Sequence, residues 1–331
     1  MKNVLVTGGA GFIGSNFLNL LFKNKKELNI DTIVNIDKLT YSANINNIDK
    51  ETSNYFFYKL DICDKKSNSC CEHPIINILT KHNIDYIVNF AAETHVDRSI
   101  VNPNIFLETN VLGTENLLYC ANICWKNNFE NKKFIQISTD EVYGSLNENS
   151  NEKFTELTPL EPHNPYSASK ASADLIVLSY FYTYRFPVVI TRCTNNYGPN
   201  QHQEKLIPLM IYNAIKNLSL PIYGDGKNIR DWIYVEDHCD AILNVLKKGT
   251  IGQVYNVGAN TEKTNIEIVN LILDYLKKPK TLIEYVEDRL GHDRRYGIDA
   301  TKIMTELNWQ PNILFEEGII KTIEWYKRII K

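Results

Sequence analysis

The sequence predicts an α/β protein with a doubly wound parallel sheet and a smaller, mostly C-terminal lobe. Three observations predict this fold class. Short apolar runs alternate with helical patterns as far as Arg192, a glycine-rich turn follows the first run directly, and turn signals become frequent beyond Asn195. Strands that alternate with helices are joined by right-handed crossovers, which place the strands parallel to one another in one sheet.

The larger lobe is expected to contain six strands with helices between and after them. The strands are the short apolar runs at residues 3–7, 32–37, 55–60, 85–91, 133–138 and 188–192. Helical periodicity predicts helices over residues 14–22, 75–82, 110–125, 168–184, 236–246 and 315–330. We therefore assign residues 1–194 to the larger lobe and residues 195–314 to the smaller one. Residues 230–250 are expected to pack back on the larger lobe, and 315–331 are a further candidate for such packing.

The composition excludes several classes of function. Among the 331 residues, 36 Lys and Arg stand against 39 Asp and Glu, for a net charge of -3. A nucleic-acid-binding protein normally shows a basic excess. No apolar run approaches the roughly 18 residues that span a bilayer, and the apolar N-terminal stretch runs into glycines without a signal-peptide cleavage site. We therefore expect no nucleic acid and no membrane among the partners, and a cytoplasmic protein.

The cysteines and histidines indicate neither a disulfide framework nor a metal site. The seven cysteines are odd in number and show no C-x-x-C spacing, which favours reduced thiols. The seven histidines are scattered, and no pair has the spacing of metal ligands. We expect no metal.

The glycine-rich turn TGGAGFIG at residues 7–14 predicts a dinucleotide-binding site. It contains both G-x-G-x-x-G and G-x-x-G-x-x-G, after a predicted strand and before a predicted helix. Glycine lets a pyrophosphate approach the backbone N–H groups, and the helix points its positive end at the phosphates. Asp37 ends the second strand 23 residues past Gly14. A carboxylate there accepts hydrogen bonds from the ribose and repels a 2′-phosphate, so a Rossmann lobe that binds NAD is expected; Lys38 is the feature that would suit NADP.

A tyrosine–lysine pair is the candidate for hydroxyl deprotonation. Y-x-x-x-K occurs four times, at Tyr55, Tyr166, Tyr212 and Tyr223, so the spacing alone is weak evidence. The pair Tyr166/Lys170 opens a long predicted helix and follows the fifth strand, whose carboxyl end should face the cofactor. Residues four apart share a helix face. The ammonium of Lys170 is therefore expected to lower the pKa of Tyr166.

Two acids follow the fifth strand directly, in the run Thr139-Asp140-Glu141. Asp-Glu pairs are usually solvated surface groups, and two others occur in this chain. The position of this pair, at the strand end that should meet the nicotinamide, makes it a candidate acid–base pair.

At this point the sequence resembles the nucleotide-sugar branch of the extended short-chain dehydrogenase/reductase family, and within it the dTDP-glucose 4,6-dehydratases. The resemblance covers essentially the whole chain. It is carried by the runs at residues 7–15, 91–100, 138–144, 165–170, 191–199, 204–208, 223–226, 230–232 and 291–296. The first and fourth runs are shared with epimerases and decarboxylases. The Thr-Asp-Glu triplet and the His-Asp-Arg-Arg-Tyr run at residues 292–296 are much more specific.

The resemblance implies a lyase that is redox-neutral overall. Oxidation at C4 of a hexose acidifies the proton at C5, and loss of water across C5–C6 then needs a base and an acid whose pKa values are pushed apart. In the family these roles fall on the residues that match Glu141 as base and Asp140 as acid, and Thr139 would bind the C4 hydroxyl. The resulting 4-keto-6-deoxy sugar would serve deoxysugar biosynthesis, rhamnose biosynthesis included.

The resemblance also implies two sets of binding residues. NAD would contact Gly8, Gly11, Phe12, Ile13, Gly14, Asp37, Lys38, Leu39, Thr40, Asp61, Ile62, Ala91, Ala92, Thr109, Tyr166, Lys170 and Asn196. The nucleotide sugar would contact Thr94, Thr139, Asn195, Lys205, Leu206, Pro221, Ile222, Tyr223, Arg230, Asn265, His292, Asp293, Arg294, Arg295 and Tyr296. Arg230 with Arg294 or Arg295 would bind the diphosphate, since guanidinium binds phosphate bidentately.

Alternatives remain at this stage. His202-Gln203, Leu290 and Thr94 depart from the usual family residues near the nucleotide or sugar, so the substrate is dTDP-glucose or UDP-glucose. A UDP-glucose 4-epimerase would share the glycine turn and the Tyr–Lys pair, but has no use for the two acids. A non-catalytic NAD sensor would be free to lose the catalytic groups, all of which are present.

The two long helical patterns at 110–125 and 168–184 are apolar on wide faces, which suggests burial against a partner or in the core. Relatives pair these helices across a dimer interface, so a homodimer is expected.

Overall fold

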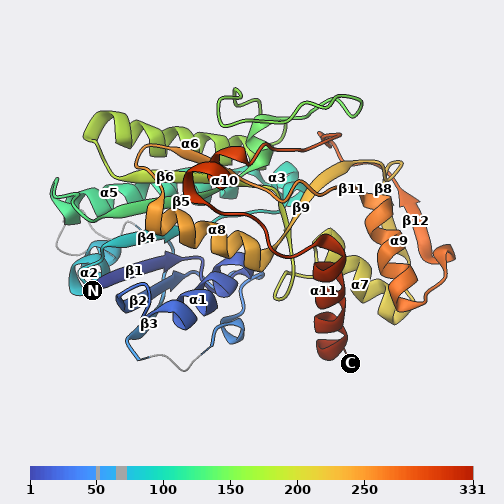
Figure 1. The fold of residues 1–331 in the computed structure, drawn as a ribbon, viewed down its shortest axis with the longest axis horizontal. Coiled ribbons are helices and arrows are strands. Elements are labelled where there is room, and N and C mark those ends of the chain that lie inside the picture. Colours follow the sequence, from blue (N-terminus) through green and yellow to red (C-terminus); the bar gives the residue numbers. More distant parts are fainter. Residues whose placement is uncertain (50–52, 65–72, 331) are drawn as a thin grey trace.

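The computed structural model describes residues 1–49, 53–64 and 73–330 of the chain. In Figure 1 the larger lobe, built on one twisted sheet, lies to the left with the N-terminus. A smaller lobe that contains α7 (Leu206–Lys216), α9 (Asn265–Leu276) and α11 (Phe315–Ile329) lies to the right.

The large sheet has the predicted doubly wound, Rossmann-type topology. Within the described residues it contains seven strands in the order β10-β6-β5-β4-β1-β2-β3, and every neighbouring pair is parallel. The strands are β1 (Lys2–Thr7), β2 (Ile30–Asp37), β3 (Tyr55–Lys59), β4 (Tyr86–Asn89), β5 (Lys133–Thr139), β6 (Val188–Cys193) and β10 (Val254–Val257). The first six correspond to the six predicted runs. The fold class is therefore confirmed, and β10 is an addition.

Helices cover both faces of this sheet. Alternate side chains of a strand point to opposite faces, and in β1 Val4 and Val6 join one core cluster whereas Leu5 joins another. The first cluster involves α1 (Phe12–Asn24), α8 (Val235–Lys248) and α10 (Thr301–Leu307). The second involves α2 (Pro74–Lys81), α5 (Thr114–Trp125) and α6 (Pro165–Tyr184). A π-helical segment, η3 (Leu107–Gly113), leads into α5, and the short α3 (Val96–Val101) and α4 (Pro103–Phe106) precede it.

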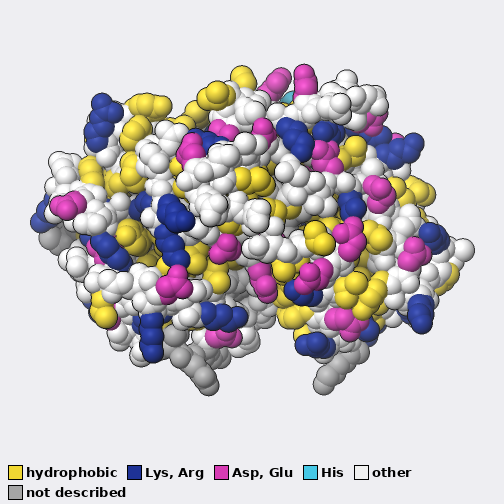
Figure 2. All heavy atoms as spheres, viewed as in Figure 1, with side chains coloured by type: hydrophobic (Ala, Val, Ile, Leu, Met, Phe, Trp, Pro, Cys, Tyr) yellow, Lys and Arg dark blue, Asp and Glu magenta, His cyan; other side chains and the backbone are white. Residues whose placement is uncertain are grey.

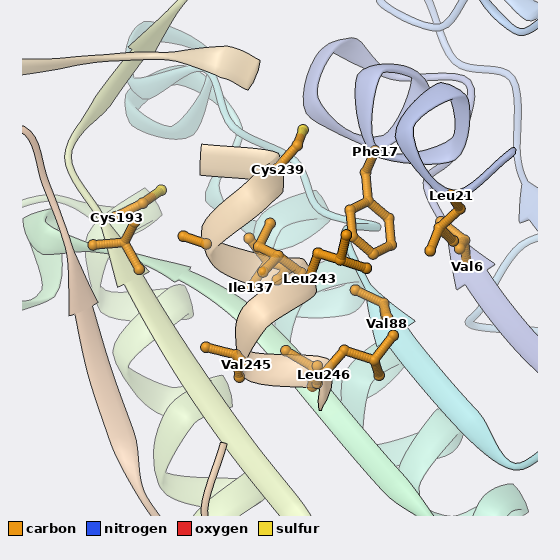
Figure 3. Close-up of a cluster of buried hydrophobic side chains, with 14 of the residues drawn as sticks. Val6, Phe17, Leu21, Val88, Ile137, Cys193, Cys239, Leu243, Val245 and Leu246 are labelled. Carbon is orange, nitrogen blue, oxygen red and sulfur yellow. The ribbon is translucent and has the colours of Figure 1, made fainter. Parts of the chain in front are cut away.

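Helix α8 belongs to the larger lobe although it follows part of the smaller one in the chain. Figure 3 shows its side chains Cys239, Leu243 and Leu246 facing Phe17 of α1 and strand residues such as Val88. Of the range 230–250, α8 packs on the larger lobe, whereas residues 230–234 belong to β9 (Ile229–Tyr234) in a separate three-stranded sheet.

The smaller lobe has its own core. Strands β7 (Asn195–Tyr197), β9 (Ile229–Tyr234) and β11 (Glu262–Thr264) form one sheet, and β8 (Leu220–Tyr223) pairs with β12 (Ile283–Val286). Helices α7, α9 and α11 pack on them in a third cluster. Helix α11 therefore lies in this lobe rather than on the larger one, because Phe315, Ile319 and Ile323 are buried against it. Conversely, β10 and α10 lie within the range 195–314 but pack in the larger lobe.

The surface carries both signs of charge. On the face shown in Figure 2, Lys and Arg side chains are interspersed with Asp and Glu over both lobes. None of the described helices combines the length and apolarity needed to cross a bilayer.

Candidate active site

The carboxyl ends of β1, β4 and β5 border the crevice where the strand order reverses, between β1 and β4. Ligands of open α/β sheets bind outside the strand ends at such a switch point. A cavity of about 290 Å³ opens there. Its lining includes these expected cofactor residues: Gly8, Gly11, Phe12, Ile13, Gly14, Asp37, Lys38, Thr40, Asp61, Ile62, Ala91, Ala92, Thr109, Tyr166, Lys170 and Asn196.

The glycine turn forms a cradle that side chains would fill. Gly8 has φ of +69°, and a Cβ there would lie 2.7 Å from the amide nitrogen of Ala91. A Cβ on Gly14 would collide with the carbonyl oxygen of Gly8. Helix α1 begins after Gly11 without a side-chain cap and without an acid in its first turn. Its free N–H groups are therefore available to phosphate.

Gly11 is the position where cofactor binding can be separated from folding. Its φ of -77° suits any residue, and a Cβ there would meet only the Gly8 oxygen, at 3.3 Å. Gly11→Ala is expected to weaken NAD binding about 10- to 100-fold by calorimetry, because the methyl group occupies space that the pyrophosphate needs. The thermal midpoint should stay close to that of the wild type. Gly14→Ala is the contrasting variant, which should lower the midpoint; unchanged NAD affinity in Gly11→Ala would contradict the cradle.

Asp37, Lys38 and Asp61 line the cavity beyond the carboxyl end of β2. The Asp37 carboxylate accepts hydrogen bonds from the amides of Ala10 at 2.8 Å and Leu39 at 2.7 Å. Burial nevertheless raises its pKa. The Lys38 ammonium lies 2.7 Å from an Asp61 carboxylate oxygen, so its charge is already compensated and a 2′-phosphate gains little there. Leu39 is a correction to the expected set: its side chain packs on the larger lobe's core instead of lining the cavity.

Strand β5 delivers the acid pair into the same cavity. It runs into a 3₁₀ turn, η4 (Asp140–Tyr143), and the Thr139 hydroxyl oxygen caps this turn by accepting from the Glu141 amide at 3.2 Å. Asp140 is 1% exposed, and its Oδ2 has no hydrogen-bond partner within the described residues. A buried carboxyl without a partner is costly when charged.

The two acids have unlike electrostatic surroundings. Burial and then the carboxylates of Glu141 and Asp231 raise the pKa of Asp140 well above its ordinary value. Burial also raises the pKa of Glu141, but Arg230, Lys205 and Arg289 oppose that rise. The geometry therefore favours a protonated Asp140 beside an ionisable Glu141, as acid–base work requires.

Helix α6 supplies the Tyr–Lys pair. Asn164 and Ser167 form a capping box around Pro165, so the helix starts one residue before Tyr166. Lys170 is 4% exposed and donates to the carbonyl oxygen of Ile137 at 2.7 Å.

The pKa of Tyr166 is shifted upward in this structure, opposite to the lowering expected from Lys170. Burial, then Glu141, Cys193 and Asp140, raise the pKa of Tyr166 well above its ordinary value. The carboxylates and the buried setting thus outweigh the ammonium, which is turned to a strand carbonyl. Tyr166 rests as a neutral phenol.

A second cavity, of about 440 Å³, adjoins the first. The two share Thr94, Glu141, Asn195, Asn196 and Lys205 in their linings. The second lining also includes these expected substrate residues: Leu206, Pro221, Ile222, Tyr223, Arg230, Asn265, His292, Asp293 and Tyr296. Thr139, which is expected both to take part in catalysis and to bind the sugar, lines the first cavity. Glu141 therefore stands where the two cavities meet.

Arg294 and Arg295 do not line this cavity, contrary to expectation. Arg294 forms ion pairs with Glu148 and Asp225. Arg295 makes a bidentate pair with Glu262, at 2.6 and 2.9 Å, and donates to backbone carbonyls. Both guanidinium groups are thus committed to protein partners.

The cations that do reach the cavity are Arg230, Lys205 and Arg289. Sequence reasoning missed Arg289, which makes a bidentate pair with Asp97 of α3 and lies over the Tyr223 ring at 5.1 Å. Arg289 lies close in sequence to the His-Asp-Arg-Arg-Tyr run, which could have suggested it as a binding residue. Sequence spacing alone, however, does not show whether Arg289, Arg294 or Arg295 faces the cavity.

Comparisons with known proteins agree with this geometry. The family model described as GDP-mannose 4,6 dehydratase matches residues 5–322. A dTDP-glucose 4,6-dehydratase of Haemophilus influenzae is 47% identical, over 98% of this chain and 98% of that protein. The crystal structure of the Bacillus anthracis dTDP-glucose 4,6-dehydratase in complex with NAD is 47% identical, with a TM-score of 0.87 over 99% of this chain and 97% of that one. DesIV, the Streptomyces venezuelae dTDP-glucose 4,6-dehydratase solved with NAD and TYD bound, is 42% identical, with a TM-score of 0.91 over 99% and 97%.

These similarities extend over nearly the whole chain at identities far above those shared by fold alone. They meet at a site that joins a dinucleotide cradle, a Tyr–Lys pair and two adjacent buried acids. The chain belongs to the dTDP-glucose 4,6-dehydratase family.

Proposed function

We propose that this protein is a NAD-dependent hydro-lyase that converts dTDP-glucose to dTDP-4-keto-6-deoxyglucose and water. The observation that carries the proposal is the unlike acid pair Asp140 and Glu141, placed beside Tyr166 where the two cavities meet. An oxidoreductase or epimerase of the same fold needs the tyrosine but not the two acids.

The residues would divide four proton transfers among them. NAD, when bound, supplies the hydride acceptor for C4, the hydride donor for C6 and the positive charge of its nicotinamide ring. Tyr166 would take the proton of the C4 hydroxyl as a phenolate, which forms once Lys170 and the positive charge that NAD supplies offset the burial and the carboxylates around it; Thr139 would orient that hydroxyl. Glu141 would then take the proton from C5, and Asp140 would give its proton to the departing C6 hydroxyl, which leaves as water. When hydride returns to C6, Glu141 would give C5 a proton that has exchanged with solvent, which completes the 4-keto-6-deoxy product. General acids and bases of this kind contribute about 10²–10⁴-fold each.

The nucleotide is proposed to lie in the second cavity. Arg230 is 7% exposed, donates to the carbonyl oxygens of Ile229 and Asp293, and lies 4.1 Å from the Tyr296 ring centre. Such a fixed guanidinium suits a diphosphate. The relatives support thymidine: those compared are named for dTDP-glucose, and the one from Streptomyces venezuelae was solved with TYD.

The test uses dTDP-glucose deuterated at C4, with deuterated UDP-glucose in a parallel reaction. The label should appear at C6 of the same molecule, with a solvent proton at C5, and without added reductant. Label that returned to C4 with inverted configuration would show an epimerase instead. Faster turnover of UDP-glucose than of dTDP-glucose would show that the uridine nucleotide sugar is the substrate.

We also propose a division of labour between the lobes. Residues 1–194, with α8 and β10 packed on them, would bind NAD, and most of the rest of 195–314, with α11, would bind the nucleotide sugar. The described cysteines form no disulfide, which supports a reducing, cytoplasmic setting. The product would enter deoxysugar synthesis, such as that of rhamnose.

The outer face of α5 and α6 supports a homodimer. Tyr119 on α5 and Leu175 and Tyr182 on α6 are 45%, 58% and 68% exposed. Exposed apolar side chains that gather on one face mark an interaction surface. The mass in solution at micromolar concentration should be twice that of the chain, and Leu175→Glu should yield the monomer. Leu157→Glu, at a 93% exposed site outside these helices, is the control; a monomeric wild type would contradict the proposal.

A further inference from the structure

A buried polar network runs beneath the two catalytic elements. The hydroxyl of Tyr143 accepts a hydrogen bond from Arg192 Nη1 at 3.0 Å and donates one to Asn256 Oδ1 at 2.8 Å. Arg192 Nε donates to Asp174 Oδ2 at 2.9 Å. The Arg192 guanidinium also lies over the Tyr143 ring, at 4.9 Å. The network thus runs from Asp174 through Arg192 and Tyr143 to Asn256.

Two members of this network lie on the elements that carry the catalytic residues. Asp174 lies on α6, one helical turn after Lys170. Tyr143 is the last residue of η4, the turn that carries Asp140 and Glu141. Arg192 lies on β6, which pairs with β5. The network therefore ties the acid-bearing turn to the helix that bears the Tyr–Lys pair.

All members of the network are inaccessible to water. Tyr143 is 2% exposed, Arg192 3%, and Asp174 and Asn256 are fully buried. Burial raises the pKa of Tyr143 to about 12, although Arg192 opposes it, so the hydroxyl keeps its proton and remains both donor and acceptor. The Tyr143 hydroxyl uses both its donor and its acceptor in this network, so the loss of either hydrogen bond would leave a desolvated polar group behind. Among the described residues Asp174 Oδ1 has no hydrogen-bond partner, so Arg192 is the partner that compensates this carboxylate.

The turn is also held by apolar packing, because Val142 and Tyr143 share a buried cluster with Phe154 and with Ala171 of α6. Thr139 caps its first residues, and the Glu161 amide donates to the Val142 carbonyl oxygen at 3.1 Å. Gly144, with φ of +90°, follows directly and reverses the chain. The Tyr143 hydroxyl adds a directional polar link from the end of the turn to α6, through Arg192 and Asp174, to this apolar packing.

We propose that Tyr143, held by Arg192 and Asn256, is a positioning residue that sets the distance of Asp140 and Glu141 from the sugar while the Tyr–Lys pair is held by α6. The inference rests on the proposed function. It assigns to Tyr143 no contact with the substrate, since Tyr143 lines neither of the two cavities.

Tyr143→Phe is the decisive variant, because it keeps the ring and its stacking on Phe154 and removes only the hydroxyl. Misplacement of reacting groups by about 1 Å can cost about 10²-fold. We expect kcat to fall about 10- to 100-fold with little change in KM. Elimination should be slowed more than oxidation. The primary isotope effect with C5-deuterated substrate reports elimination, and that with C4-deuterated substrate reports oxidation. The ratio of the first isotope effect to the second should therefore increase.

Tyr255→Phe is the matched control. Tyr255 is also buried, and its hydroxyl accepts a hydrogen bond from the Thr250 amide and donates one to the Glu306 carboxylate, away from the site. This variant should lower the thermal midpoint to a similar extent but keep the wild-type isotope effects. Equal kinetic effects of the two variants, or an unchanged ratio of isotope effects in Tyr143→Phe, would overturn the positioning role. Failure of the wild type to form the 4-keto-6-deoxy product would instead overturn the proposed function.

Discussion

Glu141→Gln is expected to lower the rate of dehydration by about 10²–10⁴-fold while oxidation at C4 stays measurable. The carboxamide has nearly the shape of the carboxylate but cannot accept the C5 proton. Oxidation depends on Tyr166 and the cofactor cavity, which the substitution leaves in place. Single-turnover experiments that follow C4 oxidation and product release separately would measure both steps.

The exposed Glu236 provides the control, since Glu236→Gln makes the same chemical change on the surface of α8 and should keep wild-type rates. If Glu141→Gln slowed C4 oxidation and dehydration equally, Glu141 would not be the base that removes the C5 proton. The same substitution should also lower the pKa of Asp140, because the Glu141 carboxylate is one of the charges that raise it.

Asp140→Asn is expected to have opposite effects on activity and on stability. Dehydration should fall about 10²–10⁴-fold, because the amide has no acidic proton to give. The free energy of unfolding at pH 8 should rise, by an amount on the order of 1–3 kcal/mol. Buried carboxyls held for function are a recurring cost to stability.

The pH dependence of this gain has a defined sign. The folded state raises the pKa of Asp140, so it keeps a proton that the unfolded chain gives up above its ordinary pKa of about 4. The free energy of unfolding therefore falls as pH rises from that value towards the folded pKa. The gain in Asp140→Asn should be small at pH 5 and larger at pH 8, as measured by denaturant titration. A gain independent of pH, or a loss at pH 8, would contradict the buried, protonated state.

Contiguous patterns allowed most of the fold and the catalytic residues to be predicted. The glycine turn, the acid pair and the Tyr–Lys pair are short motifs placed by the strands and helices that flank them. Strand β10 could not be predicted, because it is four residues long and lies between Gly252 and Gly258 in a region rich in turns.

The partners of charged side chains were harder to predict from the sequence than the fold. Three arginines stand at positions 289, 294 and 295, and only the carboxylates that fold against them decide which one faces the cavity. Those carboxylates lie far away in sequence. The pKa of Tyr166 was misjudged for a similar reason, since the local pair was visible but the surrounding burial and charges were not.

The order in which strands enter the sheet determines how much of the larger lobe can fold while the chain is still being synthesised. Because β10 borders β6 and α8 covers the sheet, a nascent chain that has emerged only through β6 has an open strand edge and an uncovered apolar layer. Such edges recruit other chains. The ribosome must therefore release more than sixty further residues, through Val257, before the NAD-binding lobe can close, and this interval is when the newborn polypeptide most needs a chaperone.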